Sequence, residues 1–390
     1  MSNDHDDPWE AEMSRTFDQR VRDLHESPLT LEHVKGKAKR IRRTRRVAAT
    51  AAGVAVAAVI IPIAVFAGQG LVDEDSGPGP ADTPSPNPTA TDTGSPGFGY
   101  LEGRTLHLED GSTVELPERY QSVTVLGEDI FATRNNDDTG QDTLDVIIER
   151  SIVTESVEVQ SGPVISDDQN VIAYLEPGGS LVTRFEGGGS GVSTDLGPNA
   201  SLAAVTGEPG CDAARPCRVF VNDDTQGAPT VIDLLGEREE PVPGALKVSD
   251  ANDDGLVTVQ NDSSDTGSCG GIYDSRASAY LWETCDYFLF DLSPDSQYVD
   301  ATHAYLDGAG NSYAAILDAA TGDELARLDP PEGLIRQTAW QDDEHLLATV
   351  YDTEGWSIYR LGVDRTVEQV VGPSTKGDDL TPAYTLLGGS

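Results

Sequence analysis

The chain has 390 residues, enough for one large domain or two of ordinary size. Hydrophobic residues make up 37% of it and charged residues 24%, which excludes a polytopic membrane protein. The formal charge of −41 is unevenly divided: residues 1–46 carry 9 acids and 11 bases, residues 47–67 carry no charge, and residues 68–390 carry the acidic excess. That excess excludes nucleic acid as a partner of the acidic part of the chain.

The first segment, residues 1–46, is predicted to be helical and cytoplasmic. Asp7 to Glu10 has the form of a helix start, with Asp as the cap and Pro at the first helical position. Apolar residues then recur at helical spacing at Trp9, Met13, Phe17, Val21 and Leu24. So short a segment cannot build a core alone. Its apolar stripe therefore packs on a second helix, on the membrane surface or on a cytosolic protein partner.

The second segment, residues 47–67, is predicted to be a transmembrane helix. It is an uncharged run of 21 residues, long enough as a helix (about 31 Å) for a hydrocarbon core of about 30 Å. Residues 35–46 hold eight bases in twelve positions, so the positive-inside rule places the N-terminus in the cytoplasm and the acidic bulk outside. Anionic lipid is the expected partner of this basic run. A cleaved signal peptide fits less well, because 46 residues precede the apolar run.

Residues 68–99 are rich in Pro, Gly, Ser and Thr, which predicts an extended linker. Over residues 100–390, polar turns followed by apolar strands recur, with strand starts at 130, 171, 202, 256, 298 and 346, on average 43 residues apart. A period of about 40–45 residues is typical of β-propeller blades. The sequence therefore predicts an all-β propeller of about six blades, or seven if one unit is degenerate. A leading strand pair, Thr105–Leu108 and Thr113–Leu116, is expected to complete the last blade, and a pair of β-sandwiches is the alternative fold.

Two short motifs carry a resemblance to known families. Ser293-Pro294-Asp295-Ser296 before one strand, and Asp318 to Gly322 before another, resemble the repeats of TolB-like and WD40-like propellers. The layout is similar to that of actinobacterial single-pass membrane proteins with an extracytoplasmic propeller, some of which are anti-sigma factors. The resemblance implies signalling through the cytoplasmic segment. The Gly-His and Trp-Asp pairs of WD40 blades are absent, and the zinc-binding anti-sigma helix is missing because no Cys precedes Cys211.

All four cysteines lie in the outer region, where an oxidising compartment favours disulfides. They are Cys211, Cys217, Cys269 and Cys285. Four cysteines allow three connectivities, and proximity in sequence favours Cys211–Cys217 and Cys269–Cys285. A zinc site does not fit these spacings.

One stretch resembles the start of a calcium loop. Asp250, Asn252 and Asp254 supply oxygen ligands at positions one, three and five, and Gly255 follows. The twelfth position is Asn261 and not the bidentate Glu of such loops. An ordinary β-turn is the favoured interpretation, and calcium, the only cofactor implied, is the alternative.

No catalytic constellation stands out. The six histidines are scattered, and the chain contains no HExxH, GxSxG or phosphate-loop motif. The two Asp-Thr-Gly-Ser tetrapeptides lie in the linker and in a polar loop, and neither follows an apolar strand. The expectation is therefore a binding or sensing protein, with an unknown extracytoplasmic ligand or protein partner, rather than an enzyme. The alternatives are a propeller hydrolase or lyase acting at the central channel, and a passive cell-envelope scaffold.

Overall fold

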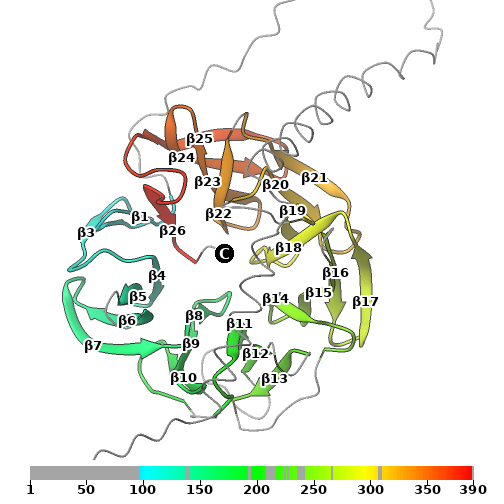
Figure 1. Cartoon of the computed structure of the whole chain (residues 1–390), viewed down its shortest axis with the longest axis horizontal. Coiled ribbons are helices and arrows are strands. Elements are labelled where there is room, and N and C mark those ends of the chain that lie inside the picture. Colours follow the sequence, from blue (N-terminus) through cyan, green and yellow to red (C-terminus); the bar gives the residue numbers. More distant parts are fainter. Residues whose placement is uncertain are drawn as a thin grey trace, which may run out of the picture. The chain divides into compact units, whose positions relative to one another are not determined.

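The computed structural model describes residues 97–136, 140–191, 195–207, 217–223, 225, 228–234, 242–264, 267–305, 310–331 and 333–388. Within these residues, 26 strands form seven antiparallel sheets around a common axis (Figure 1). The predicted β-propeller is confirmed, with seven blades rather than about six. The expected cytoplasmic segment and transmembrane helix, and all but the end of the linker, lie outside the described residues. Within those residues, no helix is long and apolar enough to cross a bilayer.

The blades are numbered here in chain order, and the strands of each are given from the channel outward. Blade 1 contains β26 (Tyr384–Leu386), β1 (Tyr100–Glu102), β2 (Thr105–His107) and β3 (Thr113–Glu115). Blade 2 contains β4 (Ser122–Leu126), β5 (Asp129–Asn136), β6 (Gln141–Ile148) and β7 (Ile152–Val159). Blade 3 contains β8 (Ser161–Ile165), β9 (Val171–Glu176) and β10 (Ser180–Phe185), and blade 4 contains β11 (Ala200–Thr206), β12 (Arg218–Asp223) and β13 (Thr230–Asp233).

The remaining three blades each have four strands. Blade 5 contains β14 (Lys247–Ala251), β15 (Leu256–Ser264), β16 (Gly267–Asp274) and β17 (Ala279–Thr284). Blade 6 contains β18 (Tyr287–Leu292), β19 (Tyr298–His303), β20 (Ala314–Asp318) and β21 (Glu324–Leu328). Blade 7 contains β22 (Leu334–Trp340), β23 (His345–Asp352), β24 (Gly355–Gly362) and β25 (Val367–Ser374).

Blade 1 closes the ring, because its innermost strand comes from the far end of the described chain. β26 pairs antiparallel with β1, and Tyr100 lies opposite Leu386. From blade 7, the Gln337 side chain binds the backbone of Leu386. Its Nε2 donates to the Leu386 carbonyl at 3.3 Å, and its Oε1 accepts from the Leu386 N–H at 2.8 Å. The leading strands β2 and β3 therefore complete a blade that also contains the last strand, β26, as expected. This blade is additional to the six units recognised in the sequence.

The position of a strand within its blade decides its burial. The second strand is covered on both faces by neighbouring blades, and in β9 five consecutive residues from Val171 to Leu175 are buried. A strand covered on both faces is continuously apolar, which makes it visible in a sequence. The outermost strands β7 and β17 alternate or are largely exposed. Five of the six strand starts found in the sequence belong to second strands, whereas the start at residue 202 falls in the innermost strand β11.

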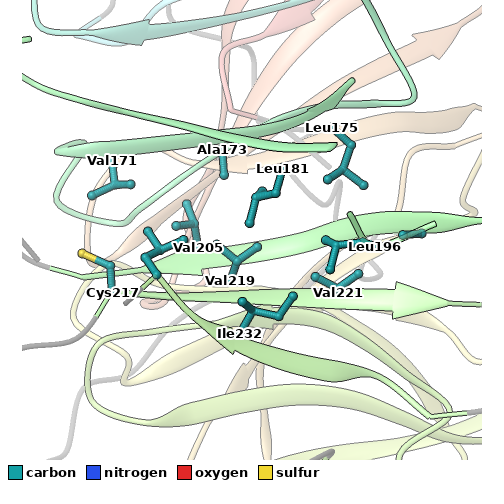
Figure 2. Close-up of a cluster of buried hydrophobic side chains, with 12 residues drawn as sticks. Val171, Ala173, Leu175, Leu181, Leu196, Val205, Cys217, Val219, Val221 and Ile232 are labelled. Atoms are coloured by element: carbon teal, nitrogen blue, oxygen red, sulfur yellow. The ribbon is translucent and has the colours of Figure 1, made fainter. Parts of the chain in front are cut away.

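The hydrophobic core of the described part is divided into seven clusters, one at each junction between neighbouring blades. Figure 2 shows the cluster between blades 3 and 4, in which Val171 and Leu175 of β9 lie above Val219 and Val221 of β12. These aliphatic side chains are almost fully removed from water. Each blade therefore buries both of its faces only when its two neighbours are present, which couples the stability of adjacent blades.

A Ser and an Asp close the turn between the innermost and second strands in blades 3 and 6. The buried hydroxyl of Ser166 accepts from the Val171 N–H at 3.1 Å and donates to Asp168 Oδ1 at 2.8 Å. Ser293 and Asp295 make the equivalent contacts in blade 6. In these two turns the Ser and the Asp two residues later form a hydrogen-bonding arrangement that satisfies backbone groups.

Candidate binding site in the central channel

The seven innermost strands surround a channel on the propeller axis (Figure 1) that contains a cavity of about 420 Å³. Every blade contributes to its walls. The contributors from the strands include Ser122 to Thr124 of β4, Gly162 to Ile165 of β8, Ala203 and Ala204 of β11, Ser249 and Asp250 of β14, Asp291 and Leu292 of β18, Trp340 of β22 and Leu386 of β26. The channel therefore forms only when the ring is closed.

The charged side chains in the walls of this cavity are all acidic. Asp167, Asp250 and Asp291 line it, and the described lining residues include no Lys, Arg or His. The rest of the lining combines apolar side chains, among them Leu292 and Trp340, with the polar side chains of Ser, Thr and Gln residues. Carboxylates between low-dielectric walls concentrate a negative potential, which favours a positively charged occupant.

Asp250 has a fixed orientation in the channel wall. Its Oδ2 accepts a hydrogen bond from the backbone N–H of Leu292, in the next blade, at 2.8 Å. Burial raises the pKa of the Asp250 carboxyl to about 6, although hydrogen bonds from the Leu292 and Ala251 N–H groups favour its ionised form. The hydrogen bond to the Leu292 N–H anchors the Asp250 carboxyl across the junction of blades 5 and 6.

Asp167 lies at the channel mouth, in the turn that follows β8, and its side chain is exposed to solvent. Partial loss of hydration at the channel mouth raises the pKa of its carboxyl to about 8, and the negative charges of four acidic neighbours contribute to the rise: Asp250, Asp253, Asp168 and Asp254. The turns of blades 3 and 5 therefore meet at one mouth of the channel. Because nearby negative charge raises this pKa, a cation bound at the mouth would lower it and favour release of the Asp167 proton.

The three residues proposed for calcium each have a protein partner of their own. Asp250 accepts from the Leu292 N–H, as described above. Asn252 accepts from the Leu256 N–H at 2.9 Å and so closes its turn, as Ser166 does in blade 3. Asp254 is exposed and forms an ion pair of 3.5 Å with Arg276. Among the described residues, no group of three or more His, Cys, Asp or Glu side chains could hold a metal ion. The geometry is that of a turn, the favoured interpretation of this stretch.

None of the three cysteines in the described part of the chain lines the channel cavity. Cys269 of β16 and Cys285, just after β17, have their sulfur atoms 2.00 Å apart and close a loop across the outer edge of blade 5. Cys217 is fully buried and disulfide-bonded, while Cys211, its expected partner, lies outside the described residues.

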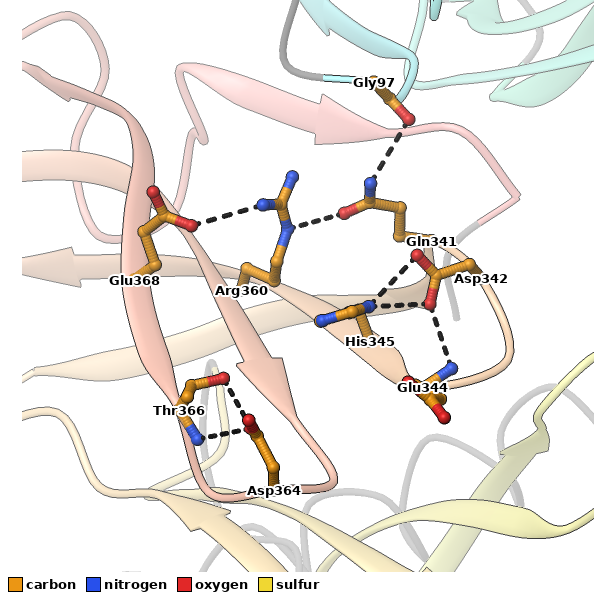
Figure 3. Close-up of polar contacts among 9 residues, drawn as sticks. All are labelled: Gly97, Gln341, Asp342, Glu344, His345, Arg360, Asp364, Thr366 and Glu368. Carbon is orange, nitrogen blue, oxygen red and sulfur yellow. Dashed lines mark hydrogen bonds and ion pairs between the residues drawn. The ribbon is translucent and has the colours of Figure 1, made fainter. Parts of the chain in front are cut away.

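In the turn between β22 and β23 of blade 7, an aspartate contacts groups of its own turn and has a structural role (Figure 3). Asp342 contacts His345 Nδ1 at 2.8 Å. Beside this turn, Arg360 Nε donates to Gln341 Oε1 at 2.7 Å, and Arg360 forms an ion pair of 3.2 Å with Glu368. Here the acid belongs to the local packing of the turn. Among the described residues, the carboxylates that line the cavity come from blades 3, 5 and 6.

Comparisons with known proteins concern the fold. No family model matches the chain, and a search of curated proteins finds no match. Similar solved structures include prolyl oligopeptidase B from Galerina marginata in its apo form, with a TM-score of 0.44 and 11% identity over 67% of this chain. The chain spans 43% of the length of that peptidase. The β-propeller domain of Myceliophteria thermophila Cps50 (Swd1) gives a TM-score of 0.41 and 11% identity, over 65% of this chain and 87% of that one. These similarities assign no activity or partner.

Sequence reasoning did not single out Asp167 or Asp291 as site residues. Asp167 belongs to a turn recognised as part of the repeat, Ser166 to Gln169, but the sequence does not show that this turn meets that of blade 5 at the channel. A signal was present in the concentration of acids in the turns before second strands. Carboxylates converge at one mouth of the channel. A propeller hydrolase or lyase acting at the channel would also use such an arrangement, so it is considered below beside ligand binding.

Proposed function

We propose that the chain is a single-pass membrane protein whose outer propeller binds a small organic cation in its central channel. The observation that carries the ligand class is the cavity of about 420 Å³ with Asp167 and Asp250 in its walls and no basic residue in its described lining. A cavity of this size is in the lower part of the range for ligand pockets, about 300–1,000 Å³. The mixture of carboxylates with apolar walls fits an amine that carries a hydrocarbon chain.

An aromatic side chain adds to this chemistry. Trp340 lies in the cavity wall, and its indole N–H donates to the backbone carbonyl of Asp291 at 3.0 Å, which fixes the ring. An ammonium group near an indole face gains a cation–π contact. The channel therefore offers charge, aromatic surface and apolar surface to one ligand.

Topology and signalling complete the proposal. The apolar run at residues 47–67 and the bases at 35–46 support an anchor with the N-terminus in the cytoplasm, the basic run on anionic lipid and the propeller outside. Ligand binding is signalled to a cytosolic protein through residues 1–46. Protease added to intact cells tests this arrangement: it should digest an epitope placed after residue 390 and spare one placed before residue 1, and the opposite result would refute the topology.

The ligand class is tested by calorimetry on the full chain in detergent, with spermidine as the probe. At pH 7 the binding enthalpy should depend on the ionisation enthalpy of the buffer, because the bound cation displaces the proton of Asp167. Asp167→Asn should remove this buffer dependence, and Asp167→Asn with Asp250→Asn should weaken binding about tenfold or more. Glu158→Gln, on the exposed outer strand β7, is the matched control. Unchanged spermidine affinity in the double variant would refute the channel as the site.

A second function rests on one observation. A carboxyl whose pKa is raised and which lies close to other carboxylates is an arrangement that hydrolases use for a general acid. In this alternative, Asp167 donates a proton to a leaving group and Asp250 acts as the base. Turnover of chromogenic substrates that is lost in Asp167→Asn would favour the enzyme over the binding protein. In the scaffold alternative, capture of protein partners by the chain is unchanged in the double variant.

A further inference from the structure

A second cavity, the junction pocket, lies between blades 1 and 2. It has a volume of about 290 Å³ and is lined by Leu108, Val125, Gly127, Glu128, Ile130, Glu149 and Arg150. None of these residues lines the channel cavity. The volume is at the lower limit for pockets that hold drug-sized ligands, about 300 Å³, so its occupant is a smaller molecule.

One wall of the junction pocket is apolar and fixed by the core. Val125 of β4 and Ile130 of β5 lie directly opposite each other in the sheet of blade 2. Leu108 comes from blade 1, just after β2. Ile130 is buried in the core cluster between these two blades, and Leu108 and Val125 pack against that cluster. The wall therefore presents a preformed surface of three branched aliphatic side chains.

The polar side of the pocket carries both signs of charge. Glu128 lies in the turn between β4 and β5, and Glu149 and Arg150 form the turn between β6 and β7. All three side chains are exposed. Arg150 reaches across the junction, where its Nη1 donates to Ser112 Oγ of blade 1 at 3.3 Å. One guanidinium and two carboxylates beside an aliphatic wall are complementary to a molecule with a carboxylate, an ammonium and an apolar chain.

The turn that supplies two of these charges has an unfavourable backbone for its residues. Glu149 and Arg150 have φ of 50° and 62°, and the Ser151 N–H closes the turn on the Ile148 carbonyl at 3.1 Å. Two consecutive residues with positive φ define a hairpin turn that strongly prefers Asn-Gly. Side chains retained in such a conformation are common at binding sites, where their chemistry outweighs the backbone cost. The Glu-Arg pair places its charges at the pocket despite this backbone cost.

We propose that the junction pocket binds a small apolar α-amino acid. Arg150 binds the carboxylate, Glu128 and Glu149 bind the ammonium, and the side chain of the ligand packs on Leu108, Val125 and Ile130. This site is separate from the channel, so it stands or falls independently of the cation proposed there.

The test uses the full chain in detergent and L-leucine as the probe, with binding followed by calorimetry. Leucine should bind more tightly than 3-methylbutylamine, which lacks the carboxylate, and than 4-methylpentanoate, which lacks the ammonium. Arg150→Gln should weaken leucine binding about tenfold or more and leave 3-methylbutylamine unchanged. Absence of leucine binding at concentrations up to about 10 mM, or equal loss of both ligands in Arg150→Gln, would overturn the proposal.

A turn replacement separates binding from folding. Glu149→Asn with Arg150→Gly installs the preferred turn sequence, so the melting temperature should be unchanged or higher while leucine binding is lost. Ser278→Gly relieves positive φ at an exposed turn of blade 5, where Ser278 has φ of 53°, and should leave leucine binding intact. Retained leucine affinity in the Asn-Gly variant would show that the turn charges do not bind the ligand and would refute the site. Spermidine binding should be unaffected in both variants.

Discussion

Asp300 is a buried carboxyl with half of its hydrogen-bonding capacity unused. It lies on β19, is 1% exposed, and its Oδ2 accepts from the hydroxyl of Thr338 across the junction of blades 6 and 7. Its Oδ1 has no hydrogen-bond partner in the described part of the protein. Burial raises the pKa of Asp300 from its ordinary value of 3.8 to about 7, against hydrogen bonds from Thr338 and the Ala301 N–H that lower it.

The shift has a definite consequence for stability. A pKa raised from 3.8 to about 7 in the folded state corresponds to about 4 kcal/mol. Below pH 3.8 both states hold the proton and the contribution is fully present. As pH rises toward 7, the unfolded chain releases the proton while the folded chain retains it, so the free energy of unfolding falls, and it is level again above the folded pKa. We predict that Asp300→Asn, which is neutral at every pH, removes this loss.

Urea unfolding of the full chain in a non-ionic detergent, followed by tryptophan emission from pH 4 to pH 8, measures the effect. The stability of Asp300→Asn relative to the unmodified protein should increase by about 4 kcal/mol over this range. Asp145→Asn is the control. Asp145 is equally buried but accepts from Tyr120, Arg134 and Ser156, so its replacement should destabilise the fold by about 2 kcal/mol. A difference between Asp300→Asn and the unmodified protein that does not change with pH would refute the reasoning.

Three further predictions concern ring closure, the disulfide and the repeated turn. Gln337→Met should leave the Leu386 N–H and carbonyl without their side-chain partner and cost about 1–3 kcal/mol, with faster hydrogen exchange in β26 and β1 than in blade 4. Cys269→Ser with Cys285→Ser opens a loop of 16 residues and should lower stability in urea by about 3 kcal/mol, whereas dithiothreitol should then have no further effect on blade 5. Ser293→Ala removes the buried hydroxyl that closes the turn before β19 and should lower the melting temperature by an amount equivalent to about 1–2 kcal/mol.

The fold could be predicted from the sequence because second strands, buried on both faces, repeat visibly. Blade 1 was not among the repeat units recognised in the sequence, for a topological reason. The repeat was found through the turn between innermost and second strands, and in blade 1 those strands, β26 and β1, are supplied by opposite ends of the described chain. No such turn exists there to be recognised. In blade 4 the strand start at residue 202 lies in the innermost strand β11. The predicted repeat spacing therefore counted blade 4 correctly but identified a different strand of the blade than in the other five units.

The sites could be predicted less well, because they depend on which turns meet in space. Asp167 and Asp254 are 87 residues apart in sequence and belong to turns that look alike. The effect of Asp254 on the pKa of Asp167 exists only because the turns of blades 3 and 5 share one channel mouth. The hairpin turn at Glu149 and Arg150 lacks the Gly or Asn residues that are typical of such turns. Neither the turn nor the pocket beside it could therefore be predicted from the sequence.

The pairing of β26 with β1 also sets the timing of folding during synthesis. β1 is made first, yet its neighbour on the channel side, Tyr384–Leu386, begins 282 residues after β1 ends. Until then β1 presents an unpaired edge to any other strand in reach, an edge open to mispairing between chains. The final strand of the propeller, β26, therefore closes the ring by covering this edge. A chain that stops short of residue 384 should be removed by quality-control proteases rather than accumulate as an open ring.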